Sequence, residues 1–338
     1  MIHSIQRKWG KISTFTHMLH YKEALRAPLP NFIEIEPTTR CNATCGTCSR
    51  SSLAKDDLKN DLSISTARRI LESFPDIKFI RFIGLGEIFL NPHIEEILEL
   101  FKKKSIKVWI ITNGSLLRNT KVRQLIHKYI YDVGISIDST DKVSFQAIRP
   151  MGKIGLDEVT DGMRELIKER NNKASNVIIG IHNTTNELNH QNLPDLSSLA
   201  IKLRVDYLAV GFMENWLMQG DSGYHSTAER IHASLHLIPH IQKTLRYQQW
   251  RLALHGILLG YKLPKRRIGK CAWPYRSVHI TAEGHVTPCC ARTQPNHGTF
   301  NINTGNFSEY WNGNEYQALR LAHMQKDTLN PICGNCPL

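Results

Sequence analysis

The eight cysteines of the chain lie in two groups, and both groups have the spacing of metal ligands rather than that of a disulfide framework. The first group is Cys41, Cys45 and Cys48, and the second is Cys271, Cys289, Cys290, Cys333 and Cys336. Clustered thiols of this kind favour metal binding in a reducing compartment. We therefore expect metal centres at both ends of the chain and a cytoplasmic protein.

The first group, Cys41-x3-Cys45-x2-Cys48, directly follows a short apolar strand, so its three thiolates can converge from one loop. Three protein ligands leave one coordination position open. In a four-iron cluster, three thiolates hold three irons and the fourth iron can bind a small molecule. Zinc remains the less favoured alternative, because a structural zinc site needs a fourth protein ligand and a catalytic zinc more often uses histidine or carboxylate.

In the second group, two cysteines flank a predicted hairpin and two stand close to the C-terminus, in the pattern C-x12-G-x4-C followed later by C-x2-C. Cys271, Cys289, Cys333 and Cys336 could together hold a second iron–sulfur cluster, and their spacing alone would also permit a zinc ion. Cys290 would point to the opposite side of an extended segment if Cys289 is a ligand, so we expect it not to bind metal.

Six short apolar runs, rich in β-branched residues, predict buried strands. They are residues 32–36, 78–84, 107–112, 132–138, 176–182 and 206–212. Helical patterns with capping signals separate them, as at Asn91-Pro92. Alternating strands and helices predict a parallel sheet, and six such units predict a partial (βα)6 barrel of the TIM type. Sites in such barrels gather at the carboxyl ends of the strands.

We expect four regions along the chain of 338 residues. They are an N-terminal extension (1–30), the partial barrel (31–215), a helical connector (216–270) and a small C-terminal α+β domain (271–338). Residues 227–262 have helical spacing, and we interpret the histidines of this segment as lying on the helix surface. In the C-terminal domain, SVHITAEGHVTPCC predicts a hairpin with its turn at Glu283-Gly284.

The cysteine loop IEPTTRCNATCGTC resembles the cluster loop of the radical S-adenosylmethionine (radical SAM) superfamily, whose signature is CxxxCxxC. The resemblance covers residues 31–215. It implies that Cys41, Cys45 and Cys48 bind a [4Fe–4S] cluster, and that S-adenosylmethionine (SAM) on its open iron is reductively cleaved to a 5′-deoxyadenosyl radical. Thr47 departs from the pattern, since the family commonly has an aromatic residue there that packs near the adenine.

The same resemblance implies the contacts to SAM. Gly84, Gly86 and Glu87 match the motif that receives the methionine amino group, Ser136 and Asp138 match positions near the ribose and methionine, and Arg149 matches an arginine that pairs with the methionine carboxylate. Thr112-Asn113-Gly114 also ends a predicted strand, and the sequence leaves it open between a cofactor or substrate loop and a simple turn.

The C-terminal cysteine pattern resembles the shortened SPASM, or twitch, domain of that superfamily. The resemblance implies one auxiliary [4Fe–4S] cluster, because too few cysteines remain for the two clusters of a complete SPASM domain. A cluster with four protein ligands has no open iron, so its natural use is electron transfer. This favours a net oxidation, with epimerisation and other radical outcomes as alternatives, and it implies an external electron donor such as a flavodoxin or ferredoxin.

Three side chains are candidates for acting on the substrate. Glu36 shares one face of the first strand with Glu34 and adjoins the cysteine loop, and His182 and Asn183 end the fifth strand. The substrate expected by resemblance is a small polar molecule, such as a sugar, a cyclitol or a nucleotide-linked metabolite. A peptide maturase is a less favoured alternative, because only 40 residues precede Cys41 and many maturases carry a longer N-terminal peptide-recognition domain.

The formal net charge of +13 is spread along the chain, and aromatic residues do not interleave with its basic runs as in a groove for single-stranded nucleic acid. An anionic small molecule accounts for the charge as well. A non-catalytic zinc or iron–sulfur module that binds nucleic acid stays the alternative of another class. The sequence has neither a signal-peptide pattern nor an apolar run of about 18 residues, so we expect no membrane association.

Overall fold

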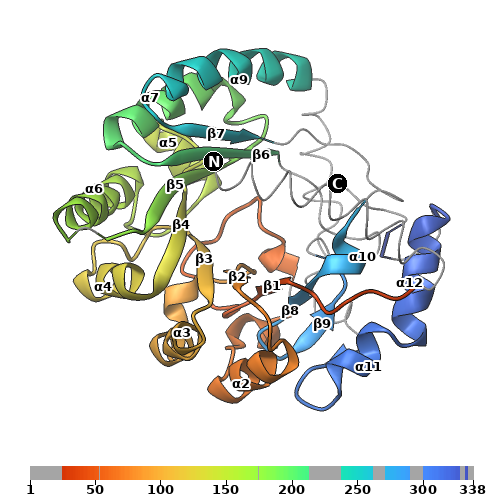
Figure 1. Cartoon of the computed structure of the whole chain (residues 1–338). Helices are drawn as coiled ribbons and strands as arrows, with labels where there is room; N and C mark the ends of the chain where they lie inside the picture. The colour runs from red at the N-terminus through yellow and green to blue at the C-terminus, as the bar shows by residue number, and fades with distance from the viewer. Residues whose placement is uncertain are drawn as a thin grey trace.

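The computed structural model describes residues 25–52, 54–173, 175–212, 237–261, 271–289, 300–327 and 332–333. Within these ranges the strands form one curved sheet of ten strands, in the order β10-β9-β8-β1-β2-β3-β4-β5-β6-β7 (Figure 1). The mixed α/β architecture with a parallel sheet confirms the expected partial barrel. No helix in the described ranges is both long and apolar enough to cross a membrane.

Eight of the strands run parallel to their neighbours and form the barrel wall. They are β1 (Phe32–Ile35), β2 (Phe79–Phe82), β3 (Lys107–Thr112), β4 (Ile130–Ser136), β5 (Ile178–Thr185), β6 (Tyr207–Phe212), β7 (Leu258–Tyr261) and β8 (Ser277–Ile280). The antiparallel strands β9 (His285–Thr287) and β10 (Phe300–Asn301) extend the sheet beyond β8.

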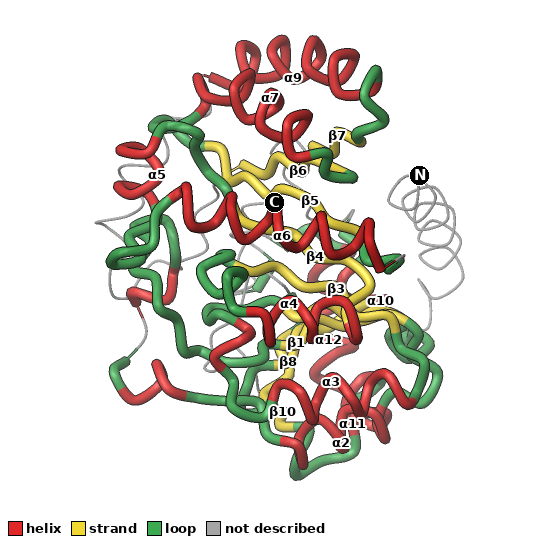
Figure 2. Tube along the Cα trace, turned by 90° about the vertical axis from the view of Figure 1, so that its left-hand side faces the viewer, coloured by secondary structure: helices red, strands yellow, loops and turns green. Residues whose placement is uncertain are grey.

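Helices cover the outer face of this wall, and Figure 2 shows α4 and α6 lying across it. The barrel helices are α2 (Ile64–Ser73), α3 (Ile94–Lys103), α4 (Thr120–Tyr129), α5 (Lys142–Ile148), α6 (Leu156–Lys173), α7 (Leu193–Leu203) and α9 (Ile238–Ala253). The C-terminal helices are α10 (Trp273–Arg276), α11 (Phe307–Trp311) and α12 (Asn314–Met324), and the 3-10 turns are Ser49–Ser52, Asp56–Lys59, Ile88–Leu90 and His190–Asn192.

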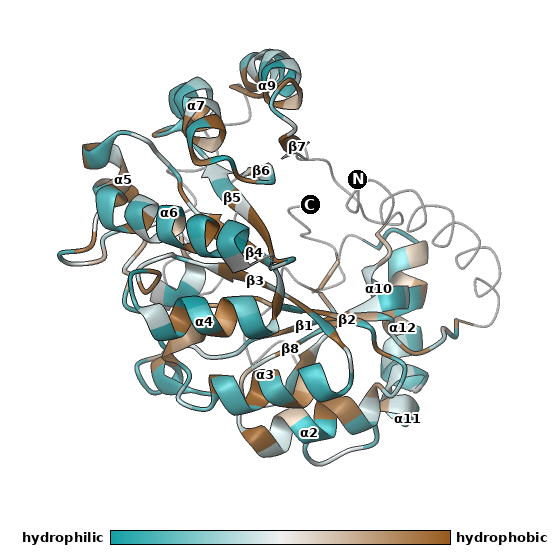
Figure 3. Ribbon diagram, turned by 60° about the vertical axis from the view of Figure 1, so that its left-hand side comes forward, coloured by the Kyte–Doolittle hydropathy of each residue, from teal (hydrophilic) through white to brown (hydrophobic). Residues whose placement is uncertain are grey.

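The helices begin where the sequence supplies polar caps and a buried apolar face. Ser63 and Asp141 each accept a hydrogen bond from a backbone N–H in the first turn of α2 and α5, which satisfies donors that have no partner inside the helix. In α3, Ile94, Ile97 and Phe101 recur at helical spacing and are buried. The helices accordingly carry both hydrophilic and hydrophobic residues in Figure 3.

The structure departs from the sequence expectation between residues 227 and 262. Only α9 is helical among the described residues of that segment, and Leu258–Tyr261 form strand β7 where the expected helical segment ends. Gly256 adopts a left-handed conformation (φ 72°) that turns the chain, and Leu258 then pairs with Tyr207 of β6. The expected hairpin is confirmed as β8 and β9, with Gly284 at φ 89° in its turn.

A chain of buried polar groups crosses the inside of the barrel near the start of β4. The Tyr207 hydroxyl donates a hydrogen bond to Asp132 Oδ1 at 2.8 Å, and His182 Nε2 lies 3.2 Å from the Tyr207 oxygen. A Cβ atom at Gly134 would lie 2.6 Å from His182 Nε2, so this glycine makes room for the imidazole. Burial raises the pKa of Asp132 to about 7, although the Tyr207 hydrogen bond opposes the shift.

Replacing Asp132 by Asn should flatten the pH dependence of stability. The pKa of Asp132 is raised from 3.8 to about 7 in the folded protein, so its stabilising contribution is present at low pH and lost as the pH rises through about 7. At about 1.4 kcal/mol per pKa unit, the loss reaches about 4 kcal/mol. Thermal unfolding under anaerobic conditions from about pH 5 to pH 8 should show a Tm that falls less in Asp132→Asn than in the wild type. The exposed Asp76→Asn serves as control, and equal slopes in all three proteins would contradict the assignment.

Candidate active site

A cavity of about 360 Å³ lies at the carboxyl ends of the strands, where barrel sites are expected. Its lining comes from the cysteine loop after β1, the loop after β2, the ends of β3, β4 and β5, and strand β8. The lining includes Glu34, Cys41, Cys45, Cys48, Arg81, Gly84, Gly86, Glu87, Thr112, Asn113, Ser136, Arg149 and His279. The structure therefore brings together residues that are far apart in the sequence.

The thiols of the first group lie close enough to influence one another. Burial raises the pKa of Cys45 to about 11; the Arg149 guanidinium opposes the shift, and the neighbouring Cys48 and Cys41 thiols add to it. Burial also raises the pKa of Cys48. Backbone N–H groups point at two of the sulfurs, from Ala43 to Cys41 Sγ at 3.5 Å and from Arg50 to Cys48 Sγ at 3.4 Å. A bound metal centre would offset the cost of ionising these thiols.

This donor set fits an iron–sulfur cluster. Three thiols from one loop line one cavity, and thiolates are the ligands of such clusters. No group of three or more His, Cys, Asp or Glu side chains in the described parts of the chain is arranged to hold a single metal ion.

The loop after β2 lies directly on the backbone that leads into Cys41. The Glu87 N–H donates to the Arg40 carbonyl oxygen at 2.8 Å. A Cβ atom at Gly86 would overlap the Thr38 carbonyl oxygen and lie 2.6 Å from that of Arg40. Gly84 has a similar constraint, because its Cβ would lie 2.6 Å from Glu36 Oε1. Glycine at both positions permits this close approach.

Glu87 is buried and held by two donors from the end of β3. Its Oε1 accepts from the Thr112 hydroxyl at 2.7 Å, and its Oε2 accepts from the Asn113 N–H at 2.8 Å. The Asn113 side-chain amide also lies 3.8 Å from Cys41 Sγ, while Gly114 turns the chain at φ 78°. The segment that the sequence left open is thus both a turn and a part of the cavity wall. Burial raises the pKa of Glu87 despite these hydrogen bonds.

Arg149 reaches the cavity wall because a buried carboxylate holds it. Its Nε donates to Asp138 Oδ2 at 2.5 Å, and Asp138 Oδ1 accepts from the Thr184 N–H at 2.7 Å. One Arg149 Nη lies 4.0 Å from Cys45 Sγ. Ser136 and Arg149 line the cavity, whereas Asp138 lies behind the wall and positions the guanidinium.

None of the three side chains expected to act on the substrate is among those that line the cavity. The Glu36 carboxylate accepts from the Leu85 N–H at 2.8 Å and the Ala282 N–H at 3.3 Å. His182 contacts the Tyr207 hydroxyl, and Asn183 donates to the Asp138 carbonyl oxygen at 3.1 Å. Each of the three has a structural partner, and their action on substrate stays a prediction.

Three residues that sequence reasoning did not select form the inner end of the cavity. They are Glu34, Arg81 and His279. The alternation of β1 placed Glu34 on the same face as Glu36, so that signal existed in the sequence. No local signal identified His279, because its strand reaches the site only by pairing with β1.

In the second cysteine group, Cys271, Cys289 and Cys333 are partly buried, and Cys290 and Cys336 lie outside the described residues. Cys289 and Cys333 both lie near Tyr316. Burial raises the pKa of the Tyr316 hydroxyl well above its usual value, and the two thiols add smaller contributions in the same direction. The fold thus brings together two cysteines from separate parts of the C-terminal domain.

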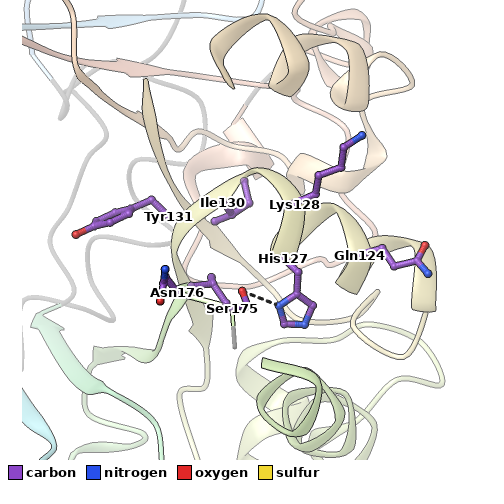
Figure 4. A pocket seen from close by; sticks show the side chains of 8 residues that line it. Gln124, His127, Lys128, Ile130, Tyr131, Ser175 and Asn176 are labelled. Atoms are coloured by element: carbon purple, nitrogen blue, oxygen red, sulfur yellow. Dashed lines mark hydrogen bonds between the residues drawn. The ribbon is translucent and has the colours of Figure 1, made fainter. Parts of the chain in front are cut away.

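A second hollow, of about 520 Å³, lies at the other end of β4 (Figure 4). Its lining includes Lys128, Tyr131 and His127, whose Nδ1 lies 3.3 Å from the Ser175 hydroxyl. Because β4 begins here and ends at Ser136 in the cysteine-lined cavity, the two hollows stand at opposite ends of one strand. We do not assign this hollow to the active site.

Comparisons with known protein families match two separate parts of the chain. Residues 35–190 match the radical SAM superfamily, and residues 271–337 match SPASM, an iron–sulfur cluster-binding domain. A "tungsten-containing aldehyde ferredoxin oxidoreductase cofactor-modifying protein" from Pyrococcus furiosus is 22% identical over 333 residues, which cover 91% of this chain and 87% of that protein. The "antilisterial bacteriocin subtilosin biosynthesis protein AlbA" from Bacillus subtilis is 26% identical over 265 residues, 78% of this chain and 55% of AlbA.

Among solved structures, Streptococcus suis SuiB bound to its precursor peptide SuiA superposes with a TM-score of 0.69 and 17% sequence identity. The match covers 90% of this chain and 70% of SuiB. At this level of identity the similarity establishes the fold. It agrees with the mixed α/β architecture and parallel sheet described above.

Replacing Gly86 by Ala should damage the cysteine site, because the new Cβ would overlap backbone atoms that cannot move independently of the loop. Overpacking of this kind costs about 1–3 kcal/mol. We expect a lower Tm and less bound iron after anaerobic reconstitution. Gly46→Ala is the matched control, because its Cβ would meet nothing within 4 Å although it lies between Cys45 and Cys48. Equal iron contents in the two variants would contradict the close approach.

Proposed function

The chain belongs to the radical SAM superfamily and carries a C-terminal SPASM domain, and on this premise we propose that it removes a hydrogen atom from a small polar substrate. The radical SAM domain implies a [4Fe–4S] cluster that binds SAM. The SPASM domain implies that the chain also binds auxiliary iron–sulfur. Held by Cys41, Cys45 and Cys48, the reduced cluster would supply an electron for the reductive cleavage of SAM. The proposal rests on one observation: three cysteines, the Gly84–Glu87 loop and Arg149 line a single cavity.

In this proposal Cys41, Cys45 and Cys48 hold the first cluster, and the surrounding side chains orient the methionine part of SAM. The buried Glu87 carboxyl receives the ammonium group. Its pKa is raised by burial without a ligand, and a bound cation would favour the carboxylate. Arg149, held in place by Asp138, pairs with the methionine carboxylate through its guanidinium. Ser136 contacts the ribose and methionine end of the cofactor.

Cys271, Cys289, Cys333 and Cys336 are the proposed ligands of one auxiliary [4Fe–4S] cluster. The common proximity of Cys289 and Cys333 to Tyr316 supports this assignment for two of the four. Such a cluster would supply a one-electron acceptor, which suits a net oxidation or an epimerisation. The electron donor would be a flavodoxin or ferredoxin, and the net charge of +13 suits an acidic redox partner.

A small polar substrate is supported by the inner end of the cavity, where Glu34, Arg81 and His279 supply charged and hydrogen-bonding groups. The relative from Pyrococcus furiosus adds support, because its name describes cofactor modification and the match extends over 91% of this chain and 87% of that protein. Sugars, cyclitols and nucleotide-linked metabolites are substrates of this kind.

Peptide modification is the second candidate. It is favoured by the similarity to AlbA, whose name describes biosynthesis of a bacteriocin. AlbA shares 26% identity over 78% of this chain, but this chain covers only 55% of AlbA. This candidate ranks second because the match covers less of AlbA than it does of the Pyrococcus furiosus protein, 55% against 87%.

Replacing Cys48 by Ala should abolish the reductive cleavage of SAM, because the first cluster would lose one of its proposed ligands. Cys290→Ala should cleave SAM at the wild-type rate, since Cys290 is the cysteine that we do not assign to a cluster. Cys333→Ala should retain cleavage in the absence of substrate but lose substrate turnover. The measurement is 5′-deoxyadenosine formed by the dithionite-reduced, reconstituted protein. Wild-type cleavage by Cys48→Ala would refute the site.

The substrate class can be tested before the substrate is known. We expect the wild-type holoenzyme to form monodeuterated 5′-deoxyadenosine when it is supplied with the low-mass filtrate of an extract from bacteria grown in D2O. The label appears because the hydrogen atom is taken from a deuterated substrate, whereas quenching by buffer or protein gives unlabelled product. Deuterium transfer from the peptide fraction alone would favour the second candidate.

A further inference from the structure

Strand β8 brings a histidine from the C-terminal domain into the wall of the barrel cavity. The β1–β8 register pairs His279 with Glu34, and the β1–β2 register pairs Glu34 with Arg81. The three side chains therefore stand side by side on the same face of the sheet, at the inner end of the cavity. This position is separate from Glu87, Ser136 and Arg149, which we assign to SAM.

Arg81 is held in place by the groups around it. Its guanidinium forms an ion pair with the buried Glu34 carboxylate. It also lies 4.7 Å from the centre of the Trp109 ring and 5.6 Å from that of Phe32. Because the Arg81 guanidinium pairs with Glu34 and lies over two aromatic rings, Arg81 and Glu34 mainly satisfy each other's charge.

His279 is different, because its ring is fully buried and neither of its nitrogens has a hydrogen-bond partner among the described residues. The Glu34 carboxylate lies beside the ring, but His279 Nδ1 is 3.7 Å from Glu34 Oε2, too long for a hydrogen bond. A buried polar group without a partner costs about 1–3 kcal/mol. A ligand in the cavity that completes these hydrogen bonds would explain why an imidazole is buried on the cavity wall despite this cost.

The charge state of the ring suits a proton acceptor. Burial lowers the pKa of His279 to about 4; the Glu36 carboxylate opposes the shift, and the Arg81 guanidinium adds to it. The imidazole is therefore neutral near pH 7 and has one nitrogen with a free electron pair. The Glu36 carboxylate, which already opposes this lowering of the pKa, would stabilise the imidazolium that forms when the ring takes a proton.

We propose that His279 binds a hydroxyl or amino group of the substrate and accepts its proton. The inference rests on the proposed function, since it takes the cysteine-lined cavity as the place of reaction. In the step, the O–H or N–H bond of the substrate breaks, an N–H bond forms on the imidazole, and the electron pair of the broken bond stays on the substrate. The substrate is therefore an alcohol or an amine with this group beside the reacting carbon.

The proposal also gives the C-terminal domain a second task. His279 lies on the segment between Cys271 and Cys289, two proposed ligands of the auxiliary cluster. The domain would thus supply the proton acceptor as well as the cluster ligands.

The test compares His279→Gln with His285→Gln, which lies in β9 of the same hairpin and does not line the cavity. Each reconstituted holoenzyme receives SAM, dithionite and the deuterated low-mass filtrate. We expect His279→Gln to lose monodeuterated 5′-deoxyadenosine about 100-fold, as for the removal of a general base, and to keep unlabelled 5′-deoxyadenosine and its iron content. His285→Gln should match the wild type. Added imidazole should restore deuterium transfer to His279→Ala.

The outcomes separate this inference from the proposed function. Wild-type deuterium transfer by His279→Gln would overturn the inference and leave the proposed function intact. Loss of labelled and unlabelled product together, with loss of iron, would show a purely structural role and would also overturn it. If only the peptide fraction transfers deuterium to the wild type, the small-substrate proposal fails, and the same comparison in that fraction decides the role of His279.

A second measurement does not depend on turnover or on the variants. Hydrogen–deuterium exchange at the C2 position of each histidine, followed by mass spectrometry of the wild-type holoenzyme, reports whether solvent reaches the ring. Because SAM would occupy part of the cavity that His279 lines and so restrict the entry of solvent, it should slow exchange at His279 and leave His285 unchanged. Equal exchange at His279 with and without SAM would refute its position on the cavity wall.

Discussion

The buried carboxylate of Glu36 joins the three segments from which the site is built. It follows β1, accepts from the Leu85 N–H in the loop after β2, and accepts from the Ala282 N–H in the turn after β8. The first contact fixes the Gly84–Glu87 loop against the backbone leading to the cysteines. The second ties the C-terminal hairpin to the same point. Without this carboxylate, two N–H groups would lose their acceptor, at about 1–3 kcal/mol for each that stays buried.

The C-terminal domain is continuous with the barrel sheet. Strand β8 pairs in parallel with β1 over four residues, and the Glu36 N–H donates to the Ile280 carbonyl oxygen at 2.8 Å just beyond them. This pairing places side chains of β8 inside the cavity. A change in the C-terminal domain can therefore reach the wall of the site through the sheet.

The charged groups of the cavity are mostly fixed by buried partners before any ligand binds. Asp138 holds Arg149, Glu34 holds Arg81, and the end of β3 holds Glu87. Such preorganisation lowers the cost of binding a charged ligand, because the groups need not reorient. His279 is the exception, since its ring nitrogens have no hydrogen-bond partner in the described structure.

The sequence by itself determined what depends on neighbouring residues: the alternation of strands and helices, the cysteine loop after the first strand, the glycines of the second loop and the hairpin turn at Gly284. Only the tertiary structure decided which of two acids, Glu34 in β1 or Glu36 just after it, lines the cavity. Glu34 and Glu36 share a face, but two backbone N–H groups bind Glu36 and leave Glu34 on the wall. The tertiary structure also placed His279, because β8 pairs with β1 although the two strands are far apart in the sequence. The hydrogen bond from the Ala282 N–H to Glu36, next to this strand pair, spans 246 positions. Local periodicity in the sequence cannot predict such distant strand pairings.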